Sequence, residues 1–295
     1  MDNHFYKDKV CVVTGASSGV GYAITKLLLD EEAIVYALDR DKVPLFGVIS
    51  INCDLSNKES IDSAFLNIPD EIDSFFGTYQ ASGTRNNFND TFIMDFIANK
   101  YITDTYLKKR MTLGGSICYL TSTSGRNWNK YSDEYIKYMN ETKWDKMLEI
   151  LKDQVNPNTS GVVAYPLAMR ALNYYASIKS LEFARKGIRV NTVSPAATNS
   201  LIEREFQAGG FGALCGQTGV ANRVASLNEV AYPILFINSN LASYISGTCL
   251  DVDYGNTALL KTSKREDNLD QRICAKKEEE IEILELDEEE EIEIL

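Results

Sequence analysis

A glycine-rich turn near the start of the chain, Thr-Gly-Ala-Ser-Ser-Gly-Val-Gly at 14–21, constrains the fold more than any other feature. An apolar run at 10–13, typical of a buried strand, precedes it, and apolar residues at helical spacing follow at 22–29. Such a turn lets the backbone approach a diphosphate, which N–H groups and the helix N-terminus then stabilise. The turn predicts a dinucleotide site, with an ordinary strand-to-helix loop as the alternative. Its candidate binding residues are Gly15, Ser17, Ser18, Gly19, Val20 and Gly21.

An acidic residue follows the second predicted strand. This strand spans 34–38 and ends at Asp39, whose carboxylate is placed to accept hydrogen bonds from the adenosine ribose and to repel a 2′-phosphate. NAD(H) is therefore favoured over NADP(H), although Arg40 offers a phosphate partner that softens this preference. A plain turn role for Asp39 is the alternative. A third strand leads to Asp54 and Leu55, which we expect beside the adenine.

Strand-like and helix-like segments alternate along most of the chain. This pattern predicts an α/β fold, a Rossmann-type doubly wound parallel sheet, as a single domain over 1–260. The chain has no run of eighteen apolar residues and no apolar core of a signal peptide. We therefore predict a cytoplasmic protein without a membrane segment. Six cysteines occur singly, without CxxC or metal-ligand spacing, so no metal site is predicted.

The end of the chain, 261–295, is predicted to be an acidic tail. Its residues 276–295 hold two lysines and eleven acidic residues, a net charge of −9 out of −12 for the whole chain. Dense like charge predicts disorder, and the recurring Ile and Leu leave an edge strand or a packed helix as alternatives. The body is close to neutral and has no basic stripe, so nucleic acid is not a predicted partner.

Five further segments, in order, resemble the short-chain dehydrogenase/reductase family over about residues 7–257. They are Gln80-Ala81-Ser82-Gly83, where that family has Asn-Asn-Ala-Gly, then Asn99, and the segments 115–122, 187–195 and 253–255. The resemblance implies that Ser122 is the active-site serine, that Asn99 supports the site, and that Ser82 and Gly83 lie at the cofactor. It also implies that Pro195 and Ser200 contact the nicotinamide end, and that the protein is a homodimer or homotetramer.

The resemblance places the proton-exchanging tyrosine at Tyr165, which lies 22 residues before Gly187. In that family a lysine one helical turn later lowers the pKa of the tyrosine and holds the nicotinamide ribose. Here that position is Met169, which carries no charge. Tyr165 is therefore expected to be a poor base near neutral pH, with reduction less affected than oxidation. Natural drift and an engineered inactivation both remain open for Met169.

Two neighbouring groups are candidate substitutes for the missing lysine. Arg170 is rotated by about 100° around the helix, which works against it. Tyr175 and Lys179 form a second Tyr-x-x-x-Lys motif, but this tyrosine lies only 12 residues before Gly187. We predict that Tyr175 and Lys179 are packing and surface residues.

The 43-residue separation of Ser122 and Tyr165 predicts a helical insertion at about 125–161. Ser132 is expected to cap a first helix, and Asn140 or Thr142 a second. The layout is similar to that of bacterial 3α-hydroxysteroid dehydrogenase/carbonyl reductases, which implies a hydrophobic ketone or alcohol substrate. An oligomer interface is the equal alternative for the insertion. The glycines at 209–216 predict a loop that closes over substrate, or a plain surface loop.

These features predict an NAD(H)-dependent oxidoreductase that interconverts a ketone and a secondary alcohol, with impaired activity because of Met169. Tyr165 would be the acid or base and Ser122 would orient the oxygen. Two other classes stay open: an NAD-binding sensor or scaffold without redox chemistry, and a lyase or isomerase that uses Tyr165 and Ser122.

Overall fold

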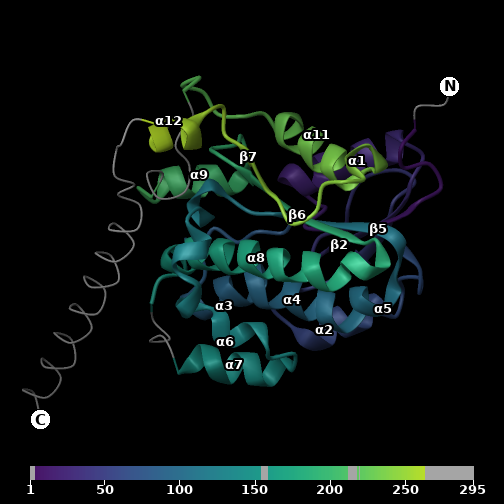
Figure 1. Ribbon diagram of the computed structural model, residues 1–295, viewed down its shortest axis with the longest axis horizontal. Helices are drawn as coiled ribbons and strands as arrows, with labels where there is room; N and C mark the ends of the chain where they lie inside the picture. The colour runs from purple at the N-terminus through teal and green to yellow at the C-terminus, as the bar shows by residue number, and fades with distance from the viewer. Residues whose placement is uncertain (1–3, 154–158, 212–217, 219, 263–295) are drawn as a thin grey trace, which may run out of the picture.

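A seven-stranded sheet forms the centre of the computed structural model, which describes residues 4–153, 159–211, 218 and 220–262 (Figure 1). All neighbouring strands are parallel, in the order β3-β2-β1-β4-β5-β6-β7. The strands are β1 (Val10–Thr14), β2 (Ile34–Asp39), β3 (Ile49–Asn52), β4 (Ile72–Gly77), β5 (Met111–Leu120), β6 (Arg189–Pro195) and β7 (Cys249–Val252). The order reverses between β1 and β4, which opens a crevice at their carboxyl ends.

Helices cover both faces of the sheet (Figure 1). One face carries α1 (Gly19–Asp30) and α11 (Leu227–Asn238), and the other carries α2 (Lys58–Phe65), α3 (Phe88–Phe92), α4 (Ala98–Ile102), α5 (Lys108–Arg110) and α8 (Gly161–Phe183). The π-helical turns 93–97 and 103–107 join α3, α4 and α5 into one rod. The remaining helices are α6 (Ile136–Met139), α7 (Trp144–Lys152), α9 (Leu201–Ala208) and α12 (Asn256–Thr262). This arrangement confirms the predicted doubly wound α/β fold.

The hydrophobic core is split by the sheet into two halves. Strands buried on both faces contribute to both halves, as β6 shows, since each of its seven residues is buried. The half between the sheet and α8 is the more aromatic, with stacked or tilted ring pairs that run through Phe88, Phe92 and Phe96. The larger core half therefore anchors α8, the helix that carries Tyr165.

The insertion contains the predicted helical material, but both predicted caps were wrong. Ser132 starts a short 3₁₀ turn instead of capping a helix, and α7 begins after Lys143 without a side-chain cap. The carboxylate of Glu141 accepts hydrogen bonds from the backbone N–H groups of Thr142 (2.8 Å) and Lys143 (2.7 Å), which ties the approach to α7 instead. Aromatic contacts dock the insertion on the body, among them Tyr138 on Phe92 at 5.3 Å and Trp144 on Tyr101 at 5.4 Å between ring centroids.

A buried charge cluster links the α4–α5 rod to α8. The carboxylate of Asp104 lies 2.5 Å from Lys100 Nζ and 2.6 Å from Lys179 Nζ, and it accepts a hydrogen bond from Tyr175 Oη at 2.9 Å. The side chains of Lys100 and Asp104 are 0% and 6% exposed. The packing role predicted for Tyr175 is thus confirmed, whereas the surface role predicted for Lys179 was wrong. The cause is a carboxylate from another helix, which sequence spacing does not display.

The carboxyl group of Asp95 is fully buried in the turn at 93–97. Its Oδ1 accepts a 2.7 Å hydrogen bond from the backbone N–H of Ala81, in the loop after β4, while its Oδ2 has no hydrogen-bond partner among the described residues. Burial raises the pKa of this carboxyl well above its ordinary value of 3.8. Asp95 therefore ties the loop 78–83 to the helical rod beneath it.

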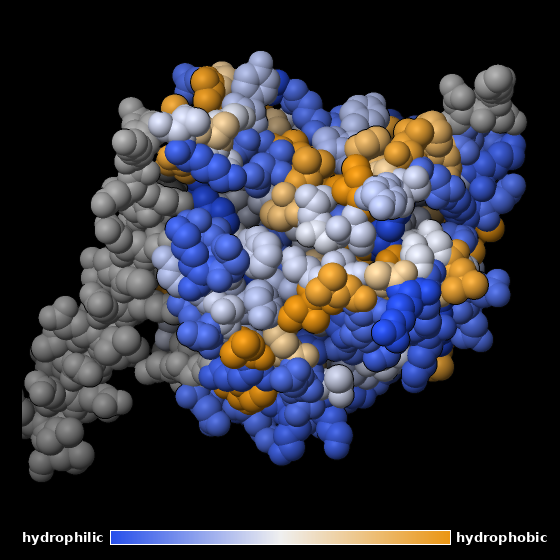
Figure 2. All heavy atoms as spheres, viewed as in Figure 1, coloured by the Kyte–Doolittle hydropathy of each residue, from blue (hydrophilic) through white to orange (hydrophobic). Residues whose placement is uncertain are grey.

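The surface in Figure 2 is mostly hydrophilic, with apolar residues in separate groups over α8, over α11 and near α6. Large side chains with substantial exposure include Leu181 on α8, Tyr232 and Phe236 on α11, and Ile136 on α6. Among the described helices, none has the length and apolar character of a membrane-crossing segment. The predicted homodimer or homotetramer and the cytoplasmic location stay predictions. The acidic tail beyond Thr262 and the glycine-rich residues 212–217 lie outside the described residues.

We expect Asp104→Asn to lower the free energy of unfolding by about 3–5 kcal/mol, because it leaves Lys100 buried without its counter-charge. Glu32→Gln is the matched control, since it removes the exposed Lys7–Glu32 pair and should leave the unfolding midpoint unchanged. Urea unfolding followed by circular dichroism measures both. An equal effect of the two substitutions would contradict the burial argument.

We expect Asp95→Asn to stabilise the protein increasingly as the pH rises above about 4. Because its pKa is raised, Asp95 keeps its proton in the folded protein at a pH where the unfolded chain releases it. Protonated Asp95 therefore supports the folded state at low pH, and the free energy of unfolding of the wild type falls as the pH rises. Asparagine keeps the acceptor for Ala81 N–H and does not ionise. The difference in unfolding free energy should grow by at most about 1.4 kcal/mol per pH unit. Urea unfolding from pH 4 to 8 measures it, and a pH-independent difference would contradict the ionisation argument.

Candidate active site

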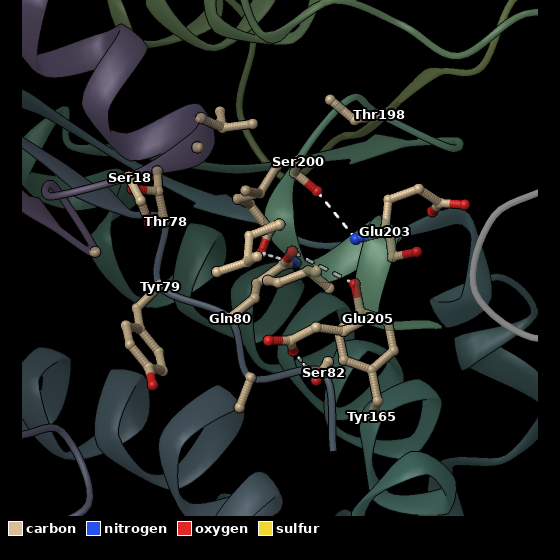
Figure 3. A pocket seen from close by; sticks show the side chains of 18 of the residues that line it. Ser18, Thr78, Tyr79, Gln80, Ser82, Tyr165, Thr198, Ser200, Glu203 and Glu205 are labelled. Atoms are coloured by element: carbon tan, nitrogen blue, oxygen red, sulfur yellow. Dashed lines mark hydrogen bonds between the residues drawn. The ribbon is translucent and has the colours of Figure 1, made fainter. Parts of the chain in front are cut away.

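A cavity of about 400 Å³ lies at the carboxyl ends of the parallel strands. Loops after β1, β2, β4, β5 and β6 line it together with α8 and α9, so segments far apart in the sequence meet there (Figure 3). Most of the residues predicted for the site lie in this lining. They are Gly15, Ser17, Ser18, Gly19, Val20, Asp39, Ser82, Ser122, Tyr165, Pro195 and Ser200.

The glycine turn forms one wall of the cavity. Gly15 has a φ of +68°, a conformation that favours glycine, and a Cβ at Gly21 would lie 2.1 Å from the Gly15 carbonyl oxygen. Helix α1 begins at Gly19, with no side-chain hydrogen bond from Ser18 and no acidic residue in its first turn. The N–H groups at this helix end are thus available to an anion in the cavity.

Asp39 connects the end of β2 to the glycine turn. Its carboxylate accepts hydrogen bonds from the backbone N–H groups of Ser17 at 3.0 Å and Asp41 at 3.1 Å. The residue is 8% exposed, and it lines the cavity beside Arg40. The guanidinium of Arg40 donates a 3.4 Å hydrogen bond to Tyr79 Oη. A carboxylate and a guanidinium thus stand side by side at the end where a ribose is expected.

Tyr165 and Ser122 enter the cavity from different elements. Tyr165 lies in the second turn of α8, and its hydroxyl points toward Gln80, with 3.4 Å between Tyr165 Oη and Gln80 Oε1 (Figure 3). The ring of Phe206 on α9 packs edge-on against the Tyr165 ring, with 5.1 Å between centroids. Ser122 follows β5, and its Oγ accepts a 3.2 Å hydrogen bond from Ser124 N–H. The cavity therefore brings together the two hydroxyls that the sequence singled out.

Met169 and Asn99 lie behind the cavity wall. Met169 is 0% exposed, and its Sδ lies 3.3 Å from Gln80 Nε2. Asn99 is 1% exposed and donates a 3.0 Å hydrogen bond to the Asp95 carbonyl, one helical turn earlier. Arg170 is buried as well, with its guanidinium 4.5 Å from the centre of the Tyr131 ring in the insertion. Its position matches the expected rotation away from the Met169 face.

Four other predicted cofactor residues lie outside the cavity lining. Asp54 Oδ1 accepts hydrogen bonds from the backbone N–H and the hydroxyl of Ser56, at 2.8 and 2.7 Å. Leu55 is 4% exposed in the core, Gly21 packs against Gly15, and Gly83 packs against Gly161. Their roles toward a cofactor stay predictions.

Helix α9 contributes side chains to the cavity that the sequence pattern did not indicate. Glu203, Glu205 and Phe206 line the cavity, and Glu205 accepts a 2.5 Å hydrogen bond from Ser82 Oγ and forms a 3.0 Å ion pair with Arg85. Burial raises the pKa of Glu203. A signal was present, because Ser200 and Glu203 have the spacing of a helix cap, and Ser200 Oγ accepts from Glu203 N–H at 3.2 Å (Figure 3).

The insertion lies away from the cavity. No described residue of 125–161 is part of the lining, so the described insertion packs on the body without shaping this cavity.

Gln80 also lines the cavity, although the sequence pattern of its segment indicated no role for this side chain. Within the residues that the structure describes, no group of three or more His, Cys, Asp or Glu side chains is arranged to hold a metal ion.

Known oxidoreductases resemble this chain in sequence. Residues 147–257 match the family model described as Enoyl-(Acyl carrier protein) reductase. Coniferyl-alcohol dehydrogenase of Pseudomonas sp. is 27% identical over 266 residues, covering 84% of this chain and 96% of that protein. The 3alpha-hydroxysteroid dehydrogenase of Mediterraneibacter gnavus is 25% identical over 263 residues, with the same coverages.

A solved structure shows the same fold. The crystal structure of the 3-alpha-hydroxysteroid dehydrogenase from Pseudomonas sp. B-0831, complexed with NADH, has a TM-score of 0.71 and 20% identity. The match covers 87% of this chain and 100% of that one. These matches support the resemblance to the short-chain dehydrogenase/reductase family that was inferred from the sequence.

Proposed function

We propose that the chain is an NAD(H)-dependent oxidoreductase that interconverts a ketone and a secondary alcohol. One observation carries the proposal: the glycine turn after β1, Ser122 after β5 and Tyr165 on α8 open into a single cavity. Hydride and proton must reach the two atoms of one carbonyl, so their sources must share one cavity. The names of the similar proteins, a coniferyl-alcohol and a 3alpha-hydroxysteroid dehydrogenase, support the same reaction class.

The residues present fit a nicotinamide dinucleotide. The first N–H groups of α1 face the cavity without a side-chain cap, which suits them to hold a diphosphate. Asp39 lines the same cavity, and in this proposal its carboxylate accepts hydrogen bonds from the adenosine ribose. The fold of the chain is that of a dehydrogenase crystallised with NADH.

When bound, such a cofactor supplies or takes up the hydride. Tyr165 is the proposed general acid and base. In reduction its Oη–H bond breaks as the substrate oxygen gains the proton, and in oxidation Tyr165 takes the proton from the alcohol. Ser122 Oγ lines the same cavity and would donate a hydrogen bond to that oxygen. Tyr165 and Ser122 are each 3% exposed, so the proton transfer would take place with little water present.

Reduction is the direction that this site favours. The position one turn after Tyr165 holds the buried, uncharged Met169, so no cation there stabilises a phenolate. A neutral tyrosine still donates its proton to a developing alkoxide, whereas it is a weak base toward an alcohol.

A hydrophobic substrate fits the part of the cavity under α9. Leu201, Ile202 and Phe206 line this part, and Phe206 lies against the ring of Tyr165. Arg85 and Glu205 add a polar rim, with the Arg85 side chain 72% exposed. We therefore propose a ketone or secondary alcohol with an apolar body.

We expect the protein to oxidise NADH with hydrophobic ketones, and Tyr165→Phe to lower kcat about 10²–10⁴-fold, because the proton donor is lost. The dissociation constant for NADH should change less than twofold. Tyr174→Phe, on the same helix and packed against Trp128 and Tyr135, is the control and should keep kcat. Absorbance at the NADH band measures turnover, and NADH fluorescence measures binding. Binding of NADH without turnover of any ketone would instead support the dinucleotide-binding class without redox chemistry.

We expect Asp39→Asn to shift cofactor preference toward NADPH by roughly tenfold or more, because it removes the charge that repels a 2′-phosphate. Asparagine retains one oxygen acceptor for the backbone N–H groups now bound to Asp39. Asp41→Asn removes an exposed neighbouring charge in the same cavity and serves as the comparison. The ratio of the dissociation constants for NADPH and NADH measures the preference. An equal change in both substitutions would show that only the local net charge matters.

A further inference from the structure

The side chain of Gln80 occupies the space between Tyr165 and Met169. Its Nε2 lies 3.0 Å from the Thr121 carbonyl oxygen, 3.3 Å from the Leu120 carbonyl oxygen and 3.3 Å from Met169 Sδ. Its Oε1 lies 3.4 Å from Tyr165 Oη. Gln80 is thus the polar side chain in contact with both the proposed proton donor and the residue one turn further along α8.

The backbone of β5 fixes which end of the amide faces Tyr165. Carbonyl oxygens accept hydrogen bonds and do not donate, so the NH₂ end of Gln80 must point toward Leu120 and Thr121. The thioether of Met169 is a weak acceptor and suits the same orientation. Oε1 is therefore the atom presented to the Tyr165 hydroxyl.

We propose that Gln80 is a positioning residue that holds Tyr165 as a hydrogen-bond donor and thereby keeps it protonated. An amide oxygen accepts only, so the contact exists for the phenol and becomes repulsive for a phenolate. The inference rests on the proposed function and deepens it, because it makes the bias toward reduction an active property of the site. The absence of charge at Met169 then accounts for only part of that bias.

The orientation of the Gln80 amide depends on the residue at position 169, because Gln80 Nε2 contacts Met169 Sδ. An ammonium group on the residue at 169 would approach Nε2, so two donors would face each other. Turning the amide around would relieve that contact, but Oε1 would then face the carbonyl oxygens of Leu120 and Thr121. A lysine introduced at 169 therefore conflicts with Gln80, and the effects of changes at the two positions are not additive.

The test compares three substitutions of Gln80 in the full-length protein. Gln80→Met keeps the length of the side chain but removes the oxygen acceptor. Gln80→Asn keeps the amide but is too short to span Thr121 and Tyr165. Gln80→Glu keeps an oxygen acceptor and adds a negative charge near Tyr165. NMR of protein labelled with ¹³Cζ-tyrosine follows the ionisation of Tyr165, whose signal is assigned by its loss in Tyr165→Phe. Tyr165 should titrate at lower pH in Gln80→Met and Gln80→Asn than in the wild type, and at equal or higher pH in Gln80→Glu.

Tyr174 on the same helix is the control in these spectra, because simple loosening would move its titration as well, whereas loss of the Gln80 acceptor moves that of Tyr165 alone. Circular dichroism identifies any variant that does not fold, and the other two then decide. An unchanged titration in Gln80→Met and Gln80→Asn, or a lower one in Gln80→Glu, would overturn the proposal. The NMR readout needs no turnover, so it stands even if the panel of ketones is not reduced and the proposed function fails.

Steady-state kinetics test whether Gln80 and Met169 act together. Alcohol oxidation with NAD⁺ at pH 7 should rise about tenfold in Gln80→Asn/Met169→Lys over the wild type, and clearly less in Met169→Lys alone. An equal gain in the single and double variants would show that Gln80 and Met169 act independently and would overturn this part of the proposal.

Discussion

The site depends on one constraint, the common direction of all seven strands. Because parallel strands end at the same edge, the residues that follow β1, β2, β4, β5 and β6 meet there although they lie far apart in the chain. The reversal of order between β1 and β4 keeps helices from closing that edge. The two-sided core then fixes α8, and with it Tyr165, against the strand ends. The parallel strand order therefore brings the Tyr165 hydroxyl on α8 and the glycine turn after β1 into one cavity.

The loop after β4 shows how deeply the cavity is built into the fold. Asp95 holds the backbone of Ala81 from below, and Gln80 reaches two carbonyls at the end of β5. Ser82 is joined to Glu205 on α9. Three different elements therefore determine where this loop lies. A loop tied in this way presents its side chains to the cavity with little freedom, which suits an arrangement that must place a proton within hydrogen-bond distance of a substrate.

The features that could be predicted from the sequence are those encoded in short segments of the chain. The glycine turn, the apolar strands and the spacing of Tyr165 from Gly187 are encoded in short segments, and the fold and most of the cavity lining follow from them. Contacts between distant segments were beyond such reasoning. Lys179 looked like a surface lysine because its partner Asp104 lies on another helix, and Glu141 replaced the expected caps of α7 through its own carboxylate. Glu205 and Gln80 were overlooked for the same reason, since their roles exist only where loops meet.

Met169 has a different meaning once its neighbours are known. Read from the chain alone, it is the loss of a cation. In the folded protein it is buried against Gln80, whose amide is oriented by strand β5, so Tyr165, Gln80 and Met169 form a set of uncharged side chains in mutual contact. A buried neutral network avoids the desolvation of an ammonium group, and it stabilises the phenol over the phenolate. Under the proposed roles of Gln80 and Tyr165, such a network would disfavour Tyr165 as a base and keep it as a proton donor. The substitution is therefore consistent with an oxidoreductase specialised for one direction, and its severity depends on the orientation of a single amide.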